Sequence, residues 1–322
     1  MNAQLSLKSL RGWLLSLVTS LAFLAGCSNE GEKAPPSVTD PALVDALEAK
    51  YYTYLDLYTS QQDQNGFIDF KACDALLFTG LLGSVLPEGI DIKAAEKTPG
   101  EWTRRPLVNG VDTCYPENSA STISRDMLLG LQWYTWKNQR LDIAEDLYSY
   151  GEDNNWIMGK GDASRIFFTP GSQATLAEQI FRLGGENKFI KRSIPQIITE
   201  SNTGFRQHLD ILGIHLRADM TGKAENFNVV ISAANRQPRN GYYQYVRARY
   251  SDGVYDSAIA PLLNSQLFPE DRLPTSADRK AAWLWQRDDD SDWQPSADGK
   301  THSGGDFLFL AHQILKDLGR LD

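Results

Sequence analysis

One segment constrains the fold more than any other, because it predicts a helix that lacks a polar face. Residues 124–136 are apolar nearly all round, which is typical of a helix buried on every side. Residues 137–140 can form a turn, and 141–150 then have the periodicity of an amphipathic helix that ends at Gly151. We therefore predict a helical hairpin with one buried and one surface helix, and a buried helix needs further helices around it.

The same helical periodicity recurs along the chain, whereas the alternation typical of strands is scarce. The first helix is predicted at 41–58, with Asp40 as its cap and Pro41 at its first position. Residues 86–119 hold four prolines and three glycines and are predicted to be irregular. Further helices are predicted at 71–82, 172–183, 203–218, 226–236, 240–250, 255–265, 277–286 and 304–318.

The predicted fold class is all-α, with these helices joined as antiparallel hairpins. The hairpin rhythm, and the sequence Ser124-Arg125-Asp126 before a buried aromatic helix, resemble the six-hairpin α/α toroids of many carbohydrate-active enzymes. The resemblance covers residues 41–318 at the level of architecture and includes no diagnostic motif, and a fold does not fix a function. An irregular multi-helix bundle is the alternative.

The amino terminus has the three parts of a bacterial targeting segment. Lys8 and Arg11 make its start positive, and 13–25 is an apolar run that is shorter than the roughly 20 residues of a membrane-spanning helix. The sequence LAGC that ends at Cys27 resembles the lipobox of bacterial lipoproteins. The alternatives are an ordinary signal peptide with an incidental cysteine, or an uncleaved anchor.

The lipobox resemblance implies a membrane-attached protein of the cell envelope. Residues 1–26 would be the signal peptide, 27–40 the lipidated Cys27 and a polar tether, and 41–322 a single helical domain. Two or more acyl chains, such as palmitate, attach a protein stably to a membrane. Ser28 follows the cysteine where an aspartate would resemble an inner-membrane retention signal, so the outer membrane is favoured.

The remaining cysteines and the charge narrow the chemistry. With Cys27 assigned to lipid, Cys73 and Cys114 are a pair in an oxidising compartment. We predict a disulfide that closes a loop of about 40 residues and contributes roughly 3–4 kcal/mol, with two buried free thiols as the alternative. No CxxC or HxxxH spacing supports a metal site. The net charge of −9 gives no electrostatic basis for binding nucleic acid.

Polar residues gather at the starts of the predicted buried helices and in residues 151–165, which are read as a loop. The candidate catalytic carboxyl groups are those of Asp74, Asp126 and Asp162. A pair of such groups acts as acid and as base or nucleophile in glycoside hydrolysis. The candidate substrate-binding residues are Arg125, Glu152, Asp153, Trp156, Arg165, His302 and Asp306.

Each of these assignments has a structural alternative. Asp126 can serve only to stabilise the helix dipole, and residues 151–165 can be a well-capped surface loop. Asp63, Asn65 and Asp69 resemble the first half of a calcium loop, but Asp74 stands where the loop needs a bidentate glutamate. An Asx-rich turn that caps a helix is the preferred interpretation there, and no cofactor is predicted.

The sequence has no motif of a serine hydrolase, a P-loop protein, a zincin or a dinucleotide-binding enzyme. Two functions of different classes are therefore predicted side by side. The first is an anchored lipoprotein that processes a glycan, as a glycoside hydrolase or a polysaccharide lyase. The second is a non-catalytic envelope lipoprotein that binds a glycan, a peptide or a protein partner.

Overall fold

The computed structural model describes residues 38–68, 74–109, 122–160, 165–186, 204–274 and 304–322. All of them belong to one compact unit. The predicted signal peptide with Cys27, the cysteines Cys73 and Cys114, and the predicted helix at 277–286 lie outside the described residues.

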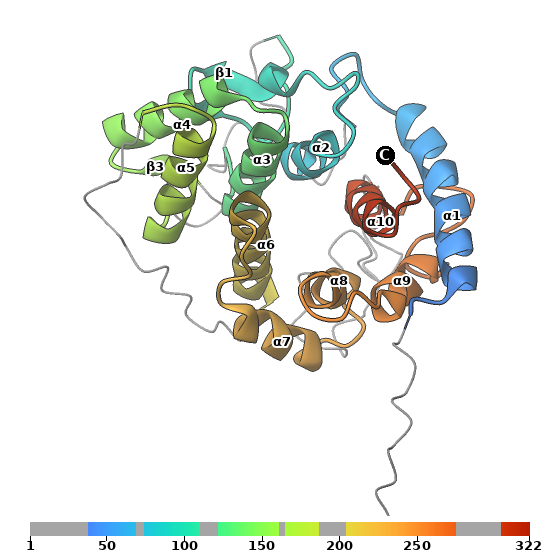
Figure 1. Cartoon of the computed structure of the whole chain (residues 1–322). Helices are drawn as coiled ribbons and strands as arrows, with labels where there is room; N and C mark the ends of the chain where they lie inside the picture. The colour runs from blue at the N-terminus through green and yellow to red at the C-terminus, as the bar shows by residue number, and fades with distance from the viewer. Residues whose placement is uncertain (1–37, 69–73, 110–121, 161–164, 187–203, 275–303) are drawn as a thin grey trace, which may run out of the picture. The chain divides into compact units, whose positions relative to one another are not determined.

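The described part of the chain is mostly helical, which confirms the all-α prediction at that level (Figure 1). Asp40 caps the first helix by accepting a hydrogen bond from the Ala42 amide at 2.9 Å, and Pro41 occupies its first turn, as predicted. The helices are α1 (Pro41–Thr59), α2 (Ala75–Gly83), α3 (Arg125–Lys137), α4 (Leu141–Asp153), α5 (Pro170–Arg182), α6 (Gly204–Thr221), α7 (Phe227–Arg236), α8 (Gly241–Arg249), α9 (Asp256–Leu263) and α10 (Gly305–Asp317).

Two small antiparallel sheets were not predicted. Residues read as irregular contain a 3-10 helix η1 (Ile92–Ala95) and the strands β1 (Glu96–Thr98) and β2 (Glu101–Trp102). Residues read as a loop contain β3 (Ile157–Lys160) and β4 (Arg165–Phe167). Strands of two to four residues are too short to show alternation in a sequence.

The prediction that α4 ends at Gly151 was wrong, because the helix continues to Asp153. Gly151 instead leaves room for an aromatic ring. A Cβ atom on Gly151 would lie 2.6 Å from the Trp156 ring. A glycine at this position therefore permits a close contact with Trp156 and does not mark the end of the helix.

Helices α2 and α3 run in the same direction at very short range. A Cβ on Gly80 would lie 2.5 Å from the carbonyl oxygen of Gly130, and one on Gly83 would lie 2.8 Å from the Tyr134 ring. The contacts advance along both helices together, so the helices are parallel. Their amino-terminal ends consequently lie at the same end of the pair.

Three more helices continue this parallel arrangement. Helix α3 contacts α6 through Trp133–His215 and then Lys137–Asp219. Helix α6 contacts α8 through His215–Tyr242 and then Asp219–Arg249. Helix α8 contacts α10 through Tyr242–Phe309 and then Arg249–Asp317, so that each pair of contacts advances along both helices. Helix α10 in turn contacts α2 (Figure 1). The five parallel helices α2, α3, α6, α8 and α10 therefore contact one another in a closed order.

The other helices pack against this set from outside. Helix α1 is antiparallel to α10, because Tyr54 packs on Phe307 near one end and Asp45 pairs with Arg320 beyond the other. Helix α9 contacts α8 and α1, α7 contacts α8, α4 contacts α3, and α5 contacts α4 and α6. Within the residues that the structure covers, no helix has the length and apolar character needed to cross a membrane.

Candidate functional site

Polar side chains that are buried or half-buried lie at the amino-terminal ends of four of the five parallel helices, α2, α3, α8 and α10. Asp74 occupies the cap position of α2, Asp126 and Asp306 lie in the first turns of α3 and α10, and Asn240 caps α8. Because these helices are parallel, their starts lie at one end of the set. A helix amino terminus favours negative charge and exposed acceptor groups.

Asp126 is a carboxyl group at this end whose pKa departs clearly from its ordinary value. The side chain is buried, and its Oδ1 accepts hydrogen bonds from the Ser124 hydroxyl and, at 3.1 Å, from the Met127 amide. Burial raises the pKa of Asp126 above its ordinary value, although the Ser124 hydrogen bond and the charge of Arg104 oppose the shift. The carboxyl group therefore holds its proton to a higher pH than an exposed aspartate does.

Arg104 links Asp126 to a second carboxyl group. It is 5% exposed, and its Nη1 lies 3.4 Å from Oδ1 of Asp74. Its carbonyl oxygen accepts the Leu76 amide at 2.8 Å, which fixes this segment beside the first turn of α2. Two of the predicted catalytic carboxyl groups thus lie near one buried guanidinium. Asp162, the third, lies outside the described residues.

Arg104 was not identified from the sequence. It lies in the stretch that was read as irregular, and its partners come from two other elements. Only the adjacent pair Arg104-Arg105, after a buried Trp102, could have drawn attention to this position.

A second polar group connects α6, α7 and α8 at the same end. The Gln237 amide donates to Oε1 of Gln207 at 3.0 Å, and the Asn240 amide donates to Oε1 of Gln237 at 3.0 Å. Oδ1 of Asn240 accepts the Tyr243 amide at 3.2 Å, which caps α8. These buried amides stabilise the loop between α7 and α8.

Asp306 is buried in the first turn of α10, where its Oδ1 accepts the Phe307 amide at 2.8 Å. His302, another of the candidate binding residues, lies outside the described residues.

The remaining predicted binding residues lie on or beside α4 and the β3–β4 hairpin. Glu152 and Asp153 are exposed in the last turn of α4, and Arg165 is exposed at the start of β4. The Trp156 ring packs edge-on against Tyr148 at 5.1 Å. Glu152, Asp153 and Trp156 precede the hairpin and Arg165 begins its second strand. Their role in binding stays a prediction.

The β3–β4 hairpin is joined to the start of α3. The Thr122 amide donates to the Lys160 carbonyl oxygen at 2.7 Å, and the Lys160 amide donates to the Thr122 hydroxyl at 3.1 Å. The end of β3 therefore lies beside Thr122, two residues before Ser124 at the start of α3. This contact brings the predicted binding segment to the side of α3 that carries Arg125.

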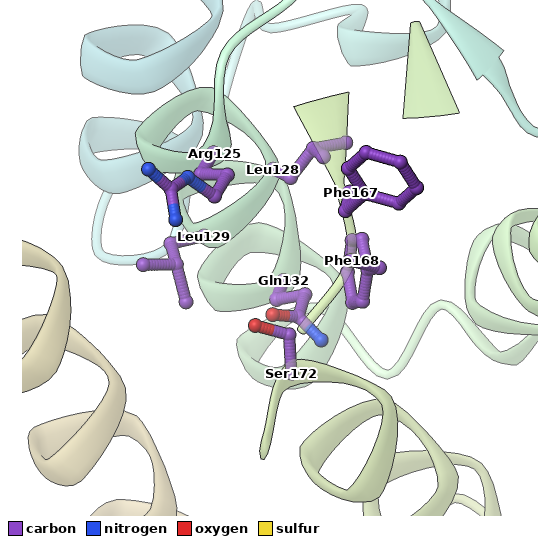
Figure 2. Close-up of a pocket in the computed structure, with 7 residues that line it drawn as sticks. All are labelled: Arg125, Leu128, Leu129, Gln132, Phe167, Phe168 and Ser172. Carbon is purple, nitrogen blue, oxygen red and sulfur yellow. The ribbon is translucent and has the colours of Figure 1, made fainter. Parts of the chain in front are cut away.

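A small pocket lies between α3, β4 and α5 and is called the α3–α5 pocket below (Figure 2). Its empty space is approximately 180 Å³, part of which is open to solvent. The lining residues are Arg125, Leu128, Leu129 and Gln132 from α3, Phe167 and Phe168 from β4 and the residue after it, and Ser172 from α5. Of these, only Arg125 was predicted.

The segment that resembles a calcium loop forms a tight turn. Oδ1 of Asp63 accepts the amides of Asn65 at 2.8 Å and Phe67 at 2.9 Å, as in an Asx turn. Asp69 lies outside the described residues. Across the described ranges, no three His, Cys, Asp or Glu side chains are grouped so that they could hold a metal ion.

The site is therefore defined by its own geometry: a buried Asp126 near Arg104, the ion pair of Arg104 with Asp74, and the α3–α5 pocket on another face of α3. Searches against protein-family models, curated proteins and solved structures find no match to this chain.

Proposed function

We propose that this chain is a lipoprotein of the bacterial cell envelope, anchored through Cys27, whose helical domain binds and cleaves a glycan. The proposed architecture is an α/α toroid with α2, α3, α6, α8 and α10 as inner helices. Their common direction and their closed order of contacts support it. The proposed reaction centre lies at the amino-terminal end of these helices, where Asp74 and Asp126 are found.

The observation that carries the proposal is the burial of the Asp126 carboxyl group, which raises its pKa. A general acid in glycoside cleavage must keep its proton near neutral pH, and burial is the usual means of achieving this. Exposed aspartates ionise near pH 4 and cannot fill that role. Burial shifts the pKa of Asp126 in the direction that this role requires, and Arg104 lies close enough to interact with its charge.

The two carboxyl groups take different parts in the proposed reaction. Asp126 donates its proton to the glycosidic oxygen as the bond to carbon breaks. Asp74, paired with Arg104, acts as the base that accepts a proton from attacking water, or as the nucleophile. In the lyase variant of the proposal, the base instead removes a carbon-bound proton beside a carboxylate, and no water is added.

The test compares Asp126→Asn with the wild-type chain on a panel of envelope and plant glycans, with release of reducing or unsaturated ends as the readout. Loss of the general acid is expected to lower the rate by about 10²–10⁴-fold. The fold should survive, because Asn resembles the protonated form that the buried site already favours. Asp271→Asn, at an exposed carboxylate, is the matched control and should leave the rate unchanged.

A second candidate function is glycan binding without catalysis. It is favoured by the 3% exposure of Asp126 and by the hydrogen bonds that engage its Oδ1. In that case no glycan is cleaved by the wild-type chain, while a glycan still binds. If a glycan is cleaved and Asp126→Asn cleaves it at the wild-type rate, the assignment of Asp126 is wrong.

A further inference from the structure

The first described residues show where the chain enters the helical domain. The Thr39 hydroxyl accepts the Tyr255 amide at 3.0 Å and donates to the Gly253 carbonyl oxygen at 3.4 Å. The Asp40 amide donates to Oδ1 of Asp256 at 2.9 Å. The chain therefore enters the domain beside the loop that joins α8 to α9.

This loop lies at the carboxyl-terminal ends of the parallel helices, which are called the attachment end below. Arg249 is the last residue of α8, and its Nη1 lies 3.0 Å from Oδ1 of Asp317, the last residue of α10. Helix α1 gives the same result independently. It begins two residues after Thr39, and its Asp45 pairs with Arg320 just beyond α10.

The proposed reaction centre lies at the opposite end of the domain. Asp126 is in the first turn of α3, whereas Lys137, the last residue of α3, pairs with Asp219 at the attachment end. Eleven residues separate Asp126 from Lys137, and a helix rises roughly 16 Å over that number. The length of an inner helix therefore separates the reaction centre from the point where the chain enters.

We propose that the attachment end faces the membrane and that the domain takes up its glycan from the side away from the membrane. The inference deepens the proposed function and rests on it, both for the lipid anchor at Cys27 and for the reaction centre. The class of substrate that fits is a glycan that is not held at the membrane surface. A glycan linked to a lipid of the membrane that carries the protein does not fit.

The number of residues between the anchor and the domain supports this orientation. Val38 follows Cys27 by eleven residues. A chain of that length spans at most about 40 Å when fully extended and averages about 18 Å as a random coil. Turning the reaction centre toward the bilayer would require these residues to run back along the side of the domain. That path admits only the longest conformations and carries an entropic cost.

The charge of the protein does not oppose this orientation. The net charge is −9, whereas anionic lipid surfaces attract clusters of lysine and arginine. An acidic protein is therefore not drawn onto the bilayer by its overall charge. The point of attachment is then left to determine which end of the domain lies near the membrane.

The orientation is measured by energy transfer from the protein to the membrane. The full-length chain, isolated with its lipid from bacterial membranes, is reconstituted into vesicles whose lipid head groups carry an acceptor dye. A fluorescent amino acid replaces Ser251 in one variant and Pro238 in the other. Both residues are exposed, and they lie beyond the end and before the start of α8. Because a helix of this length rises about 13 Å, we expect transfer at least about twofold more efficient from position 251 than from position 238.

A lengthened connection to the anchor is the matched control. A second copy of residues 28–37, inserted before Val38, should reduce the difference between the two positions, because the domain can then turn more freely. Equal transfer from both positions of the unlengthened chain, or greater transfer from position 238, would overturn the proposal. A chain that does not associate with vesicles would refute the lipid anchor, and the orientation with it.

The same vesicles test the direction from which the glycan arrives. The glycan that the chain cleaves fastest is supplied either free in solution or linked to a lipid of the same vesicle. We expect the free form to be cleaved at least about tenfold faster, because a tether that cannot span the distance to a site gives no gain in effective concentration. Equal or faster cleavage of the lipid-linked form would overturn the proposal.

The outcome is separable from that of the proposed function, because the transfer measurement requires no activity. Greater transfer from position 251 in a chain that cleaves no glycan would retain the orientation and reject the catalysis. Conversely, Asp126-dependent cleavage together with greater transfer from position 238 would retain the catalysis and reject the orientation.

Discussion

At the scale of single residues, two glycines determine how closely α2 and α3 approach. Gly80 and Gly130 bring the two backbones together, since a Cβ on Gly130 would lie 2.6 Å from the Leu77 carbonyl oxygen. Backbone atoms cannot move aside as the end of a side chain can. This contact holds the starts of both helices together, and with them Asp74 and Asp126.

Gly80→Ala should therefore be strongly destabilising. The new Cβ would lie 2.5 Å from the Gly130 carbonyl oxygen, and separating the helices should cost about 3 kcal/mol of unfolding free energy. Chemical denaturation followed by circular dichroism measures the change. Gly213→Ala in α6 is the matched control, because its Cβ meets no atom within 4 Å. It should gain about 0.5–1 kcal/mol from helix propensity, and equal effects of both variants would contradict this account.

The sequence alone does not distinguish Gly80 from Gly213. Both lie in helical stretches, and only the position of the neighbouring helix makes one of them indispensable. The same holds for Gln132, because the sequence predicts only that it belongs to a buried helix. Its unpaired side-chain amide is apparent only from the residues packed around it. Chemistry that depends on spatial neighbours cannot be read from residue order.

At the scale of elements, long helices with a clear periodicity could be predicted, whereas short strands that depend on tertiary contacts could not. Helix α1 begins where Asp40 and Pro41 indicated. The strands β3 and β4 escaped prediction because their hairpin is stabilised by contacts with Thr122 and not by a pattern of its own. Arg104 could not be predicted as a site residue either, because its ion pair with Asp74 joins two separate parts of the chain.

An ion cluster joins the carboxyl-terminal ends of the parallel helices. Asp219 of α6 accepts hydrogen bonds from Trp136 and Lys137 of α3 at 2.9 Å, and Arg249 of α8 lies 3.7 Å away. Burial alone would raise the pKa of Asp219, but the charge of Lys137 and its hydrogen bond outweigh burial and lower it. The cluster therefore favours the folded arrangement of three helices.

Asp219→Ala should destabilise the fold by about 2–3 kcal/mol, somewhat below the cost of breaking a fully buried ion pair. The substitution leaves Lys137 and Arg249 facing each other without their shared carboxylate. Thermal unfolding is the measurement. Asp45→Ala removes an exposed carboxylate that pairs with Arg320, and we expect no measurable change there. A midpoint for Asp219→Ala that matches the Asp45→Ala midpoint would show that the cluster does not stabilise the helix ends.

At the scale of the whole molecule, the core between the parallel helices contains histidines that must stay neutral. His208 and His215 are completely buried in α6, and burial lowers the pKa of each to about 3. Burial also lowers the pKa of His312, whose Nδ1 lies 3.0 Å from the Tyr51 hydroxyl. In the unfolded chain the same side chains titrate near pH 6.5. Acidification therefore protonates the unfolded chain first and draws the equilibrium toward it.

The buried histidines should lower the free energy of unfolding as the pH decreases from 7 to 5, where aspartate and glutamate of the unfolded chain remain largely ionised. The raised pKa of Asp126 acts in the opposite sense and offsets part of this loss. Each of the two fully buried histidines, His208 and His215, should contribute a loss of roughly 2 kcal/mol over that interval, or about 4 kcal/mol together. Urea unfolding at several pH values measures the loss, and a folded state of ordinary stability has only about 5–15 kcal/mol. His215→Gln should make the dependence shallower by one proton, because glutamine does not titrate. A His215→Gln profile as steep as that of the wild-type chain would mean that His215 becomes protonated in the folded chain, and thus that the packing between α6 and its neighbours admits water.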